Sequence, residues 1–164
     1  MTRVEALIGS AAFSLLAPGT VAGLIPYFIT HWRIPPHAPL THTITGAMLI
    51  TAALAALIER FTRFALRGAG TPAPIAPTEH LVVTGLYRFV RNPMYVAVIG
   101  LILGEMFLFQ HAALLPYAVV MWLAFHIFIV AHEEPTLRHE YPDEYPIFSA
   151  NVPRWIPRLM PWRG

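Results

Sequence analysis

The sequence predicts an all-α membrane protein with about four transmembrane helices, of which the third and fourth form a tight hairpin. Its 164 residues are 56% hydrophobic and only 12% charged, whereas soluble domains carry about 25% charged residues. Four apolar stretches also reach or approach the roughly 20 residues that a helix needs to cross a bilayer. Because backbone groups in lipid must be hydrogen-bonded within the segment, we expect these stretches to be helical.

The first two stretches lie in the N-terminal part of the chain. Ala6–Thr30 is longer than the ~7–15 apolar residues of a signal peptide, so we expect it to be a retained span. Pro18-Gly19 and Pro26 interrupt this stretch, and the Pro-Gly pair would kink or break its helix. The second stretch, Thr43–Ile58, is rich in alanine, and its flank extends back to Leu40.

The third and fourth stretches, Met94–Gln110 and Ala112–Ala131, form the hairpin. Little more than Gln110-His111 joins them, so both outer ends of the hairpin return to one membrane face. The loop before the hairpin and the tail after it should therefore meet at that face. We expect a single membrane domain, residues 1–164, with four parts: N-terminal helices in 1–67, a connecting loop in 68–93, the hairpin in 94–131, and a C-terminal cap with short helices in 132–164.

The orientation of the chain follows from its arginines, which make up all of its basic residues. Cytoplasmic loops carry an excess of positive charge. With four spans, ten arginines fall on one side of the membrane and only Arg33 on the other. We therefore expect both termini and residues 59–93 to be cytoplasmic, at a bacterial or archaeal inner membrane.

Several classes of function are disfavoured by composition. The chain has no cysteine, so it holds no disulfide framework and no thiolate nucleophile. A net charge of +2 is too weak to suggest a nucleic-acid partner. Three histidines on the expected cytoplasmic side, His80, His132 and His139, lack the spacing of a metal site, so we expect no bound metal. His126, inside the fourth span, should hydrogen-bond a neighbouring helix.

Two adjacent acids, Glu133 and Glu134, follow the fourth span directly. Carboxylates beside lipid are costly unless a cation meets them, and the hairpin returns Arg91 to the same face. A structural ion pair and a functional site explain this grouping equally well. Because neighbouring helical residues point about 100° apart, only one of the two acids should face a pocket. The tail also carries five aromatic residues that suit an interfacial segment: Tyr141, Tyr145, Phe148, Trp155 and Trp162.

Three motifs in order extend this picture: G-x-Y-R-x-x-R-N-P-x-Y at 85–95, E-E-x-x-L at 133–137 and V-P-R-x-I-P at 152–157. Together they resemble the isoprenylcysteine carboxyl methyltransferase and phospholipid methyltransferase superfamily. Its members are small membrane enzymes that use S-adenosylmethionine and release S-adenosylhomocysteine. The resemblance covers about half of the chain, from Thr78 to Pro157.

The resemblance implies a cofactor pocket at the cytoplasmic face. One of the paired acids would meet the amino group or ribose of the cofactor, and Arg91 would orient an acceptor carboxylate. Arg91 and Glu134 are the implied catalytic residues. The implied cofactor-binding residues are His80, Leu81, Val82, Val83, Gly85, Tyr87, Asn92, Pro93, Tyr95, Glu133 and Glu134.

The acceptor implied by the resemblance is lipophilic and enters from the bilayer. A carboxylate acceptor, such as isoprenylcysteine or another lipid acid, is already nucleophilic and needs no base. An amine acceptor, such as a phospholipid amine, would need a base such as Glu134. Asn92 stands where the carboxyl methyltransferases commonly have histidine, which leaves a binding role but no proton-handling role. The alternatives from other classes are a nicotinamide-dependent membrane reductase and a non-enzymatic membrane interaction module.

Overall fold

The computed structural model describes residues 16–67, 81 and 83–163 of the chain. These residues form helices and connecting loops without any strand, which confirms the all-α class. Several sequence predictions lie outside the described residues: the part of the first span before residue 16, the extended loop over 68–80, and the sites His80 and Val82.

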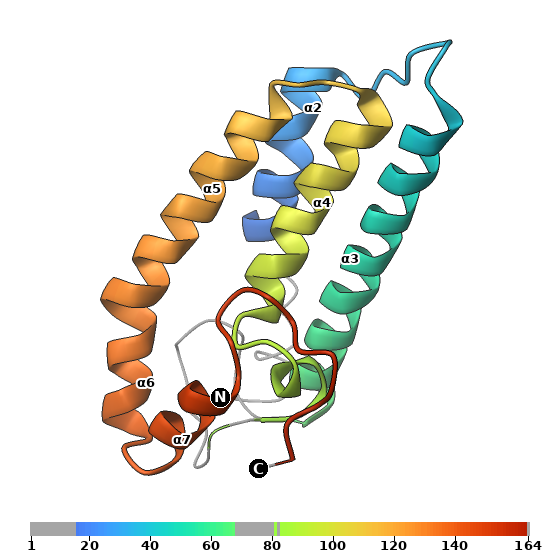
Figure 1. The fold of residues 1–164 in the computed structure, drawn as a ribbon. Coiled ribbons are helices and arrows are strands. Elements are labelled where there is room, and N and C mark those ends of the chain that lie inside the picture. The colour runs from blue at the N-terminus through green and yellow to red at the C-terminus, as the bar shows by residue number, and fades with distance from the viewer. Residues whose placement is uncertain (1–15, 68–80, 82, 164) are drawn as a thin grey trace.

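Long helical rods run side by side, and short elements gather at one end of the bundle (Figure 1). The rods are η1 Thr20–Leu24 with α2 Ile25–Thr30, then α3 Leu40–Arg67, then α4 Pro93–Phe109, and finally α5 Leu114–Phe128. The α5 rod continues through η3 Ile129–Glu133 into α6 Glu134–Glu140. Two separate short elements are η2 Gly85–Arg88, which precedes α4, and α7 Glu144–Asn151, which follows α6. The hairpin of α4 and α5 matches the prediction closely, whereas α3 extends well beyond Thr43–Ile58.

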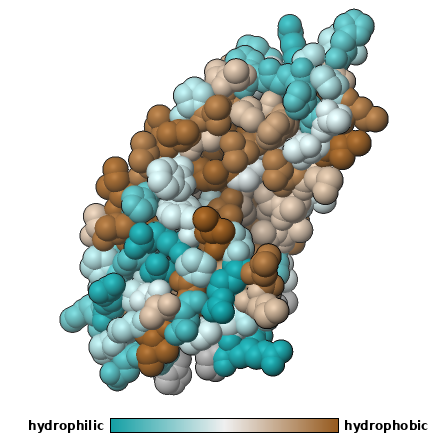
Figure 2. All heavy atoms as spheres, viewed as in Figure 1, coloured by the Kyte–Doolittle hydropathy of each residue, from teal (hydrophilic) through white to brown (hydrophobic). Residues whose placement is uncertain are grey.

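Two of the described helical segments are long and apolar enough to cross a membrane, namely Leu40–Arg60 and Leu114–Glu140. The apolar helices Leu16–Thr30 and Pro93–Phe109 are shorter, so the count of four spans stays a prediction. Side chains that point away from the bundle are apolar: Met48 and Ile127 are 67% and 64% exposed. Figure 2 shows hydrophobic residues over the middle of the bundle and hydrophilic residues gathered towards its ends. This distribution is typical of a membrane protein.

Two prolines shape the helices in the same way. A proline lacks the N–H that would bond the carbonyl four residues earlier, so the backbone must readjust there. Before Pro26, the Ile25 N–H bonds Thr20 O and forms the π-helical η1. Before Pro135, the Glu134 N–H bonds Ile129 O and forms η3.

The predicted break at Pro18-Gly19 does not occur. Residues 16–19 are α-helical and continue directly into η1. The irregularity lies instead one turn before Pro26, where the missing N–H leaves a carbonyl without its α-helical partner.

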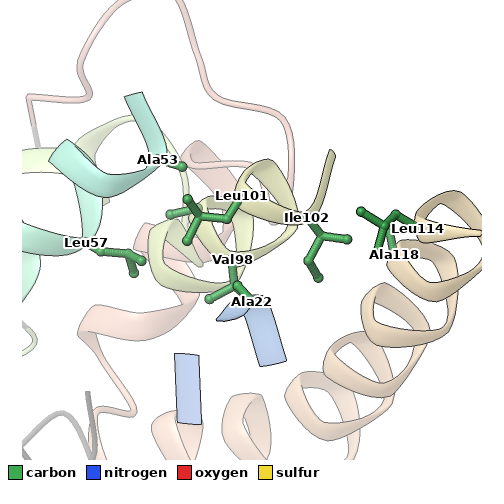
Figure 3. Close-up of a cluster of buried hydrophobic side chains, with 9 residues drawn as sticks. Ala22, Ala53, Leu57, Val98, Leu101, Ile102, Leu114 and Ala118 are labelled. Atoms are coloured by element: carbon green, nitrogen blue, oxygen red, sulfur yellow. The ribbon is translucent and has the colours of Figure 1, made fainter. Parts of the chain in front are cut away.

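Helix α4 is the centre of the bundle and packs against α3, α5 and η1. Its side chains point in several directions toward these neighbours (Figure 3). Ile102 and Leu114 are fully buried at the contact of α4 with α5. The Tyr117 hydroxyl donates a hydrogen bond of 2.7 Å to Val21 O and so ties α5 to η1. Such packing and interhelical hydrogen bonds hold helices together where lipid removes the hydrophobic driving force.

Helices α3 and α4 approach most closely at two glycines, Gly46 and Gly104. A Cβ atom added to Gly46 would lie 2.7 Å from both Gly104 O and Leu108 N, which are backbone atoms that cannot move aside easily. At Gly100, one turn away on α4, an added Cβ would meet only Ala53 Cβ at 3.6 Å. The glycine at position 46 is therefore required by the close contact of the two backbones.

We predict that Gly46→Ala destabilises the fold by roughly 1–3 kcal/mol, the usual cost of overpacking. Gly100→Ala is the matched control, because it also removes a glycine from a helix interior and should be neutral or stabilising by up to about 1 kcal/mol. Thermal unfolding in detergent would compare the two variants. Equal stability of the two variants would show that the α3–α4 contact can relax.

Candidate functional site

The loop before α4 and the tail after α7 meet at one end of the bundle (Figure 1). We call residues 152–163 the strap, because they run over the loop and bond it along its length. The hydrogen bonds join Arg91 N to Pro153 O at 2.9 Å, Asn92 Nδ2 to Arg154 O at 3.2 Å, Arg158 N to Phe89 O at 2.9 Å, Trp162 N to Arg88 O at 2.8 Å and Arg88 Nε to Trp162 O at 2.7 Å. The meeting of loop and tail that the hairpin predicted is therefore present.

The strap also fixes Arg91 and Glu134 relative to each other. Arg91 Nη1 donates to Glu134 Oε1 at 3.0 Å. Arg154 forms a bidentate pair with the same carboxylate: its Nε donates to Oε1 at 2.7 Å, and its Nη2 donates to Oε2 at 3.0 Å. The Glu134 side chain is only 10% exposed. Bidentate pairs of this kind are both strong and directional, so Glu134 joins the loop, the helical rod and the strap.

Two groups around Glu134 have shifted pKa values. The hydrogen bond to Glu134 raises the pKa of the Arg154 guanidinium further above its usual range. Burial raises the pKa of Tyr145, although Arg91, whose Nη1 lies 3.5 Å from the hydroxyl, partly opposes this. Arg91 and Arg154 carry two positive charges against the single charge of Glu134, so this part of the site keeps a surplus of positive charge.

Glu133 faces a different set of residues from those around Glu134. Tyr95 interacts with Glu133, and the Tyr95 ring packs on Phe125 with centroids 4.8 Å apart. The second oxygen of Glu133, Oε2, is buried and has no hydrogen-bond partner among the described residues. Such an oxygen is costly to leave unpaired and suits a ligand that donates a hydrogen bond.

Tyr87 lies next to a buried arginine that sequence reasoning missed. The guanidinium of Arg60 stands 4.1 Å above the centre of the Tyr87 ring, and Arg60 is 1% exposed. A cation over a tyrosine face is a favourable contact, the more so when water is excluded. Burial raises the pKa of Tyr87 despite the nearby Arg60. The arginine cluster near the end of α3 was visible in the sequence, but it was used only to predict orientation.

Two cavities adjoin the loop. The larger, of about 1530 Å³, lies between α3, the loop, α7 and the end of the strap, and three predicted cofactor-binding residues line it: Leu81, Val83 and Gly85. Gly85 has φ 60°, a left-handed conformation that glycine adopts without cost. The smaller, of about 410 Å³, is almost wholly apolar, and Pro93 lines it. Neither cavity is lined by Tyr87, Tyr95, Arg91, Asn92 or the two acids.

Two other predictions need correction. The His126 side chain bonds the strap instead of a helix, because the Trp155 Nε1 donates to its Nδ1 at 3.2 Å. Of the five tail aromatics expected at the interface, three are buried together with Val152: Tyr141, Tyr145 and Phe148. They form the small core under α7 that supports the loop. Among the residues that the structure describes, no group of three or more metal-ligand side chains comes together.

A family model described as phospholipid methyltransferase matches residues 41–144. The chain belongs to the phospholipid methyltransferase family. The match spans α3, the loop, the hairpin and α6, so it includes Arg60, Arg91 and both acids. Strap residue Arg154 lies beyond it. No curated protein shows significant similarity to the chain. The family is one of membrane methyltransferases, and its description leaves the acceptor of this chain open.

We predict that Glu134→Gln lowers the free energy of unfolding by about 1–3 kcal/mol, because two arginines then lose a charged acceptor in a largely buried place. Arg154→Met should cost less, since Arg91 still neutralises Glu134. Arg158→Met is the control, because its side chain bonds only Asn151 O at an exposed position. Chemical denaturation of the purified variants measures the differences. Equal stability of Glu134→Gln and Arg158→Met would contradict the central place of Glu134.

Proposed function

We propose that the protein transfers a methyl group from S-adenosylmethionine to a lipophilic acceptor at the end of the bundle where the loop and the strap meet. The observation that carries this proposal is the junction at Glu133 and Glu134 in a chain of this family. One acid is bound by two arginines, and its neighbour keeps a buried oxygen without a partner among the described residues. Glu134, held by ion pairs, therefore lies next to Glu133, whose buried oxygen could accept a hydrogen bond from a ligand.

The residues on this side fit the chemistry of the cofactor. S-adenosylmethionine supplies, when bound, an electrophilic methyl group on a positively charged sulfonium. Glu133 would accept a hydrogen bond from the amino group or ribose, and the ring of Tyr95 would favour positive charge, whereas the ring of Tyr87, also assigned to the cofactor, already carries Arg60 on one face. Leu81, Val83 and Gly85, which line the larger cavity, and Asn92 and Pro93 at the start of α4 are assigned to the cofactor on the family resemblance. The parts assigned to His80 and Val82 rest on the family resemblance.

The two acids take different roles in this proposal. Both oxygens of Glu134 are engaged by arginines, so we assign it the positioning of Arg91 and the strap. Glu133 takes the role of the acid that faces the pocket. This division replaces the catalytic role first suggested for Glu134, and it agrees with the expectation that only one of two adjacent acids faces a pocket.

We propose a carboxylate of a lipid or isoprenoid acid as the acceptor group. Glu134 and Tyr145 engage Arg91 Nη1, while its buried Nε has no partner among the described residues. The surplus positive charge at Arg91 and Arg154 would attract and orient a carboxylate, whose oxygen attacks without a base. Holding the reacting atoms about 3–3.5 Å apart then supplies much of the rate gain.

A phospholipid amine is the second candidate, and the description of the matching family favours it. An amine must lose a proton before or during transfer, and Glu133 is the carboxylate able to accept it. The two candidates differ in one requirement. Methylation of a carboxylate depends on Arg91, whereas methylation of an amine depends on a base at position 133.

We predict that S-adenosylhomocysteine binds the purified protein and that Glu133→Gln weakens binding by about 10- to 100-fold, the range for a charged hydrogen bond. Glu140→Gln is the matched control, because Glu140 is exposed near the end of α6. Isothermal calorimetry measures both. Binding of reduced nicotinamide dinucleotide alone would favour a reductase, and binding of neither ligand would favour a membrane interaction module.

We predict that Arg91→Ala lowers the rate of methyl transfer at least 100-fold while the affinity for S-adenosylhomocysteine stays within a few-fold. The reason is that Arg91 is assigned to the acceptor and not to the cofactor. Transfer of labelled methyl groups to lipid extracts measures turnover, and Arg33→Ala, an exposed arginine between α2 and α3, is the control. A collapse of cofactor affinity in Arg91→Ala would mean that the arginine serves the cofactor.

A further inference from the structure

We propose that the strap inserts its apolar tip into the lipid bilayer beside the helical bundle, so that the membrane itself holds the strap over the loop. We define the tip as Ile156, Leu159 and Met160. The partner is the boundary between headgroups and acyl chains of the surrounding bilayer. This inference does not depend on the reaction that the protein catalyses.

The tip residues are exposed although apolar side chains nearby are buried. Ile156, Leu159 and Met160 are 78%, 100% and 75% exposed. In the same tail, Tyr145 and Val152 are 2% and 1% exposed. The tail is therefore able to bury apolar side chains in the protein, and the tip points away from that core. Exposed large apolar side chains of this kind mark a contact surface.

The strap lies against the spanning helices at the level of their apolar band. Trp155, next to the tip, bonds His126 on α5, and its ring lies 5.7 Å from that of Trp122 on the same helix. Both α5 residues belong to the candidate span Leu114–Glu140. Pro157 lines the apolar cavity together with Val96 of α4. Figure 1 shows the strap rising from the polar end alongside the helices before it returns.

The charges of the strap suit the membrane surface. No acidic residue follows Glu144, whereas the strap carries Arg158 and Arg163 in addition to Arg154, which is bound to Glu134. Arginines beside apolar residues are attracted to anionic headgroups, and tryptophans such as Trp155 and Trp162 prefer the interface.

The backbone of the strap is also adapted to a place poor in water. Non-helical backbone at membrane depth is tolerated only where its polar groups are satisfied by protein or by a wet cavity. Prolines at 153, 157 and 161 have no N–H that needs a partner. Two N–H groups of the strap, those of Arg158 and Trp162, bond carbonyls of the loop, and those without a protein partner would take water or headgroups as partners at the boundary of the bilayer. An irregular segment with these features can enter the interface at low cost.

The absence of cysteine allows a direct test by single-site spin labelling. The variants Ile156→Cys, Leu159→Cys and Met160→Cys would be labelled in the full chain and placed in vesicles of phosphatidylcholine and phosphatidylglycerol. Collisions with oxygen, which concentrates in lipid, are compared with collisions with a water-soluble nickel chelate. Met48→Cys on α3 is the control for lipid exposure, and Asp143→Cys between α6 and α7 is the control for water exposure.

We expect oxygen to exceed the chelate by several-fold at the three tip sites, as at Met48. A chelate-dominated signal like that at Asp143 would overturn the proposal. Low collision rates with both reagents would also overturn it, because they would indicate that the tip is covered by another copy of the chain. All three labelled positions are exposed, so the substitutions should leave the fold intact, and thermal unfolding of each variant against Asp143→Cys checks this.

Discussion

The grip of Arg91 and Arg154 on Glu134 is the interaction on which the functional end of the molecule depends. The three residues belong to the loop, the strap and the rod that continues α5, segments that share no other ionic contact among the described residues. A buried carboxylate needs such partners to remain charged, and each arginine also places its own neighbours. Arg91 lies beside Tyr145 and the core under α7. The Arg154 carbonyl accepts a hydrogen bond from Asn92, and the next residue, Trp155, bonds His126. The loop and the strap therefore hold each other in place, and we expect a change that loosens one to loosen the other.

The bundle supplies a rigid support for this junction. Helix α4 begins at Pro93, immediately after the residues that the strap holds, and α3, which packs along α4, brings Arg60 over the Tyr87 ring. Both sides of the loop are thus anchored by helices, one through a charged pair and the other through a cation over an aromatic ring. Such support restricts the motion of groups that would have to bind a ligand with defined geometry.

Sequence reasoning predicted the class of fold, the hairpin and the approach of Arg91 to the paired acids, because these follow from length, composition and the short turn after Gln110. It did not identify Arg60 as a site residue, since a cluster of arginines at a helix end looks the same whether it marks orientation or packs on a ring. It also left open which acid meets Arg91, because the answer depends on the π turn of Ile129–Glu133 and on Arg154, far away in the chain. The bond from Trp155 to His126 likewise needs the path of the strap.

The π turn of η3 ends at Glu133, the first of the two acids, and lies directly before Glu134 and Pro135. A π turn holds one more residue than the corresponding α-helical turn, and each residue in a helix rotates the chain by about 100°. Removal of one amino acid from this turn would let the rod wind as a regular α-helix and would leave the following carboxylates on the same side, but the Pro135 ring would then meet the carbonyl of the preceding turn. The extra residue of the π turn is thus what lets a proline follow the two acids directly without breaking the rod that carries them.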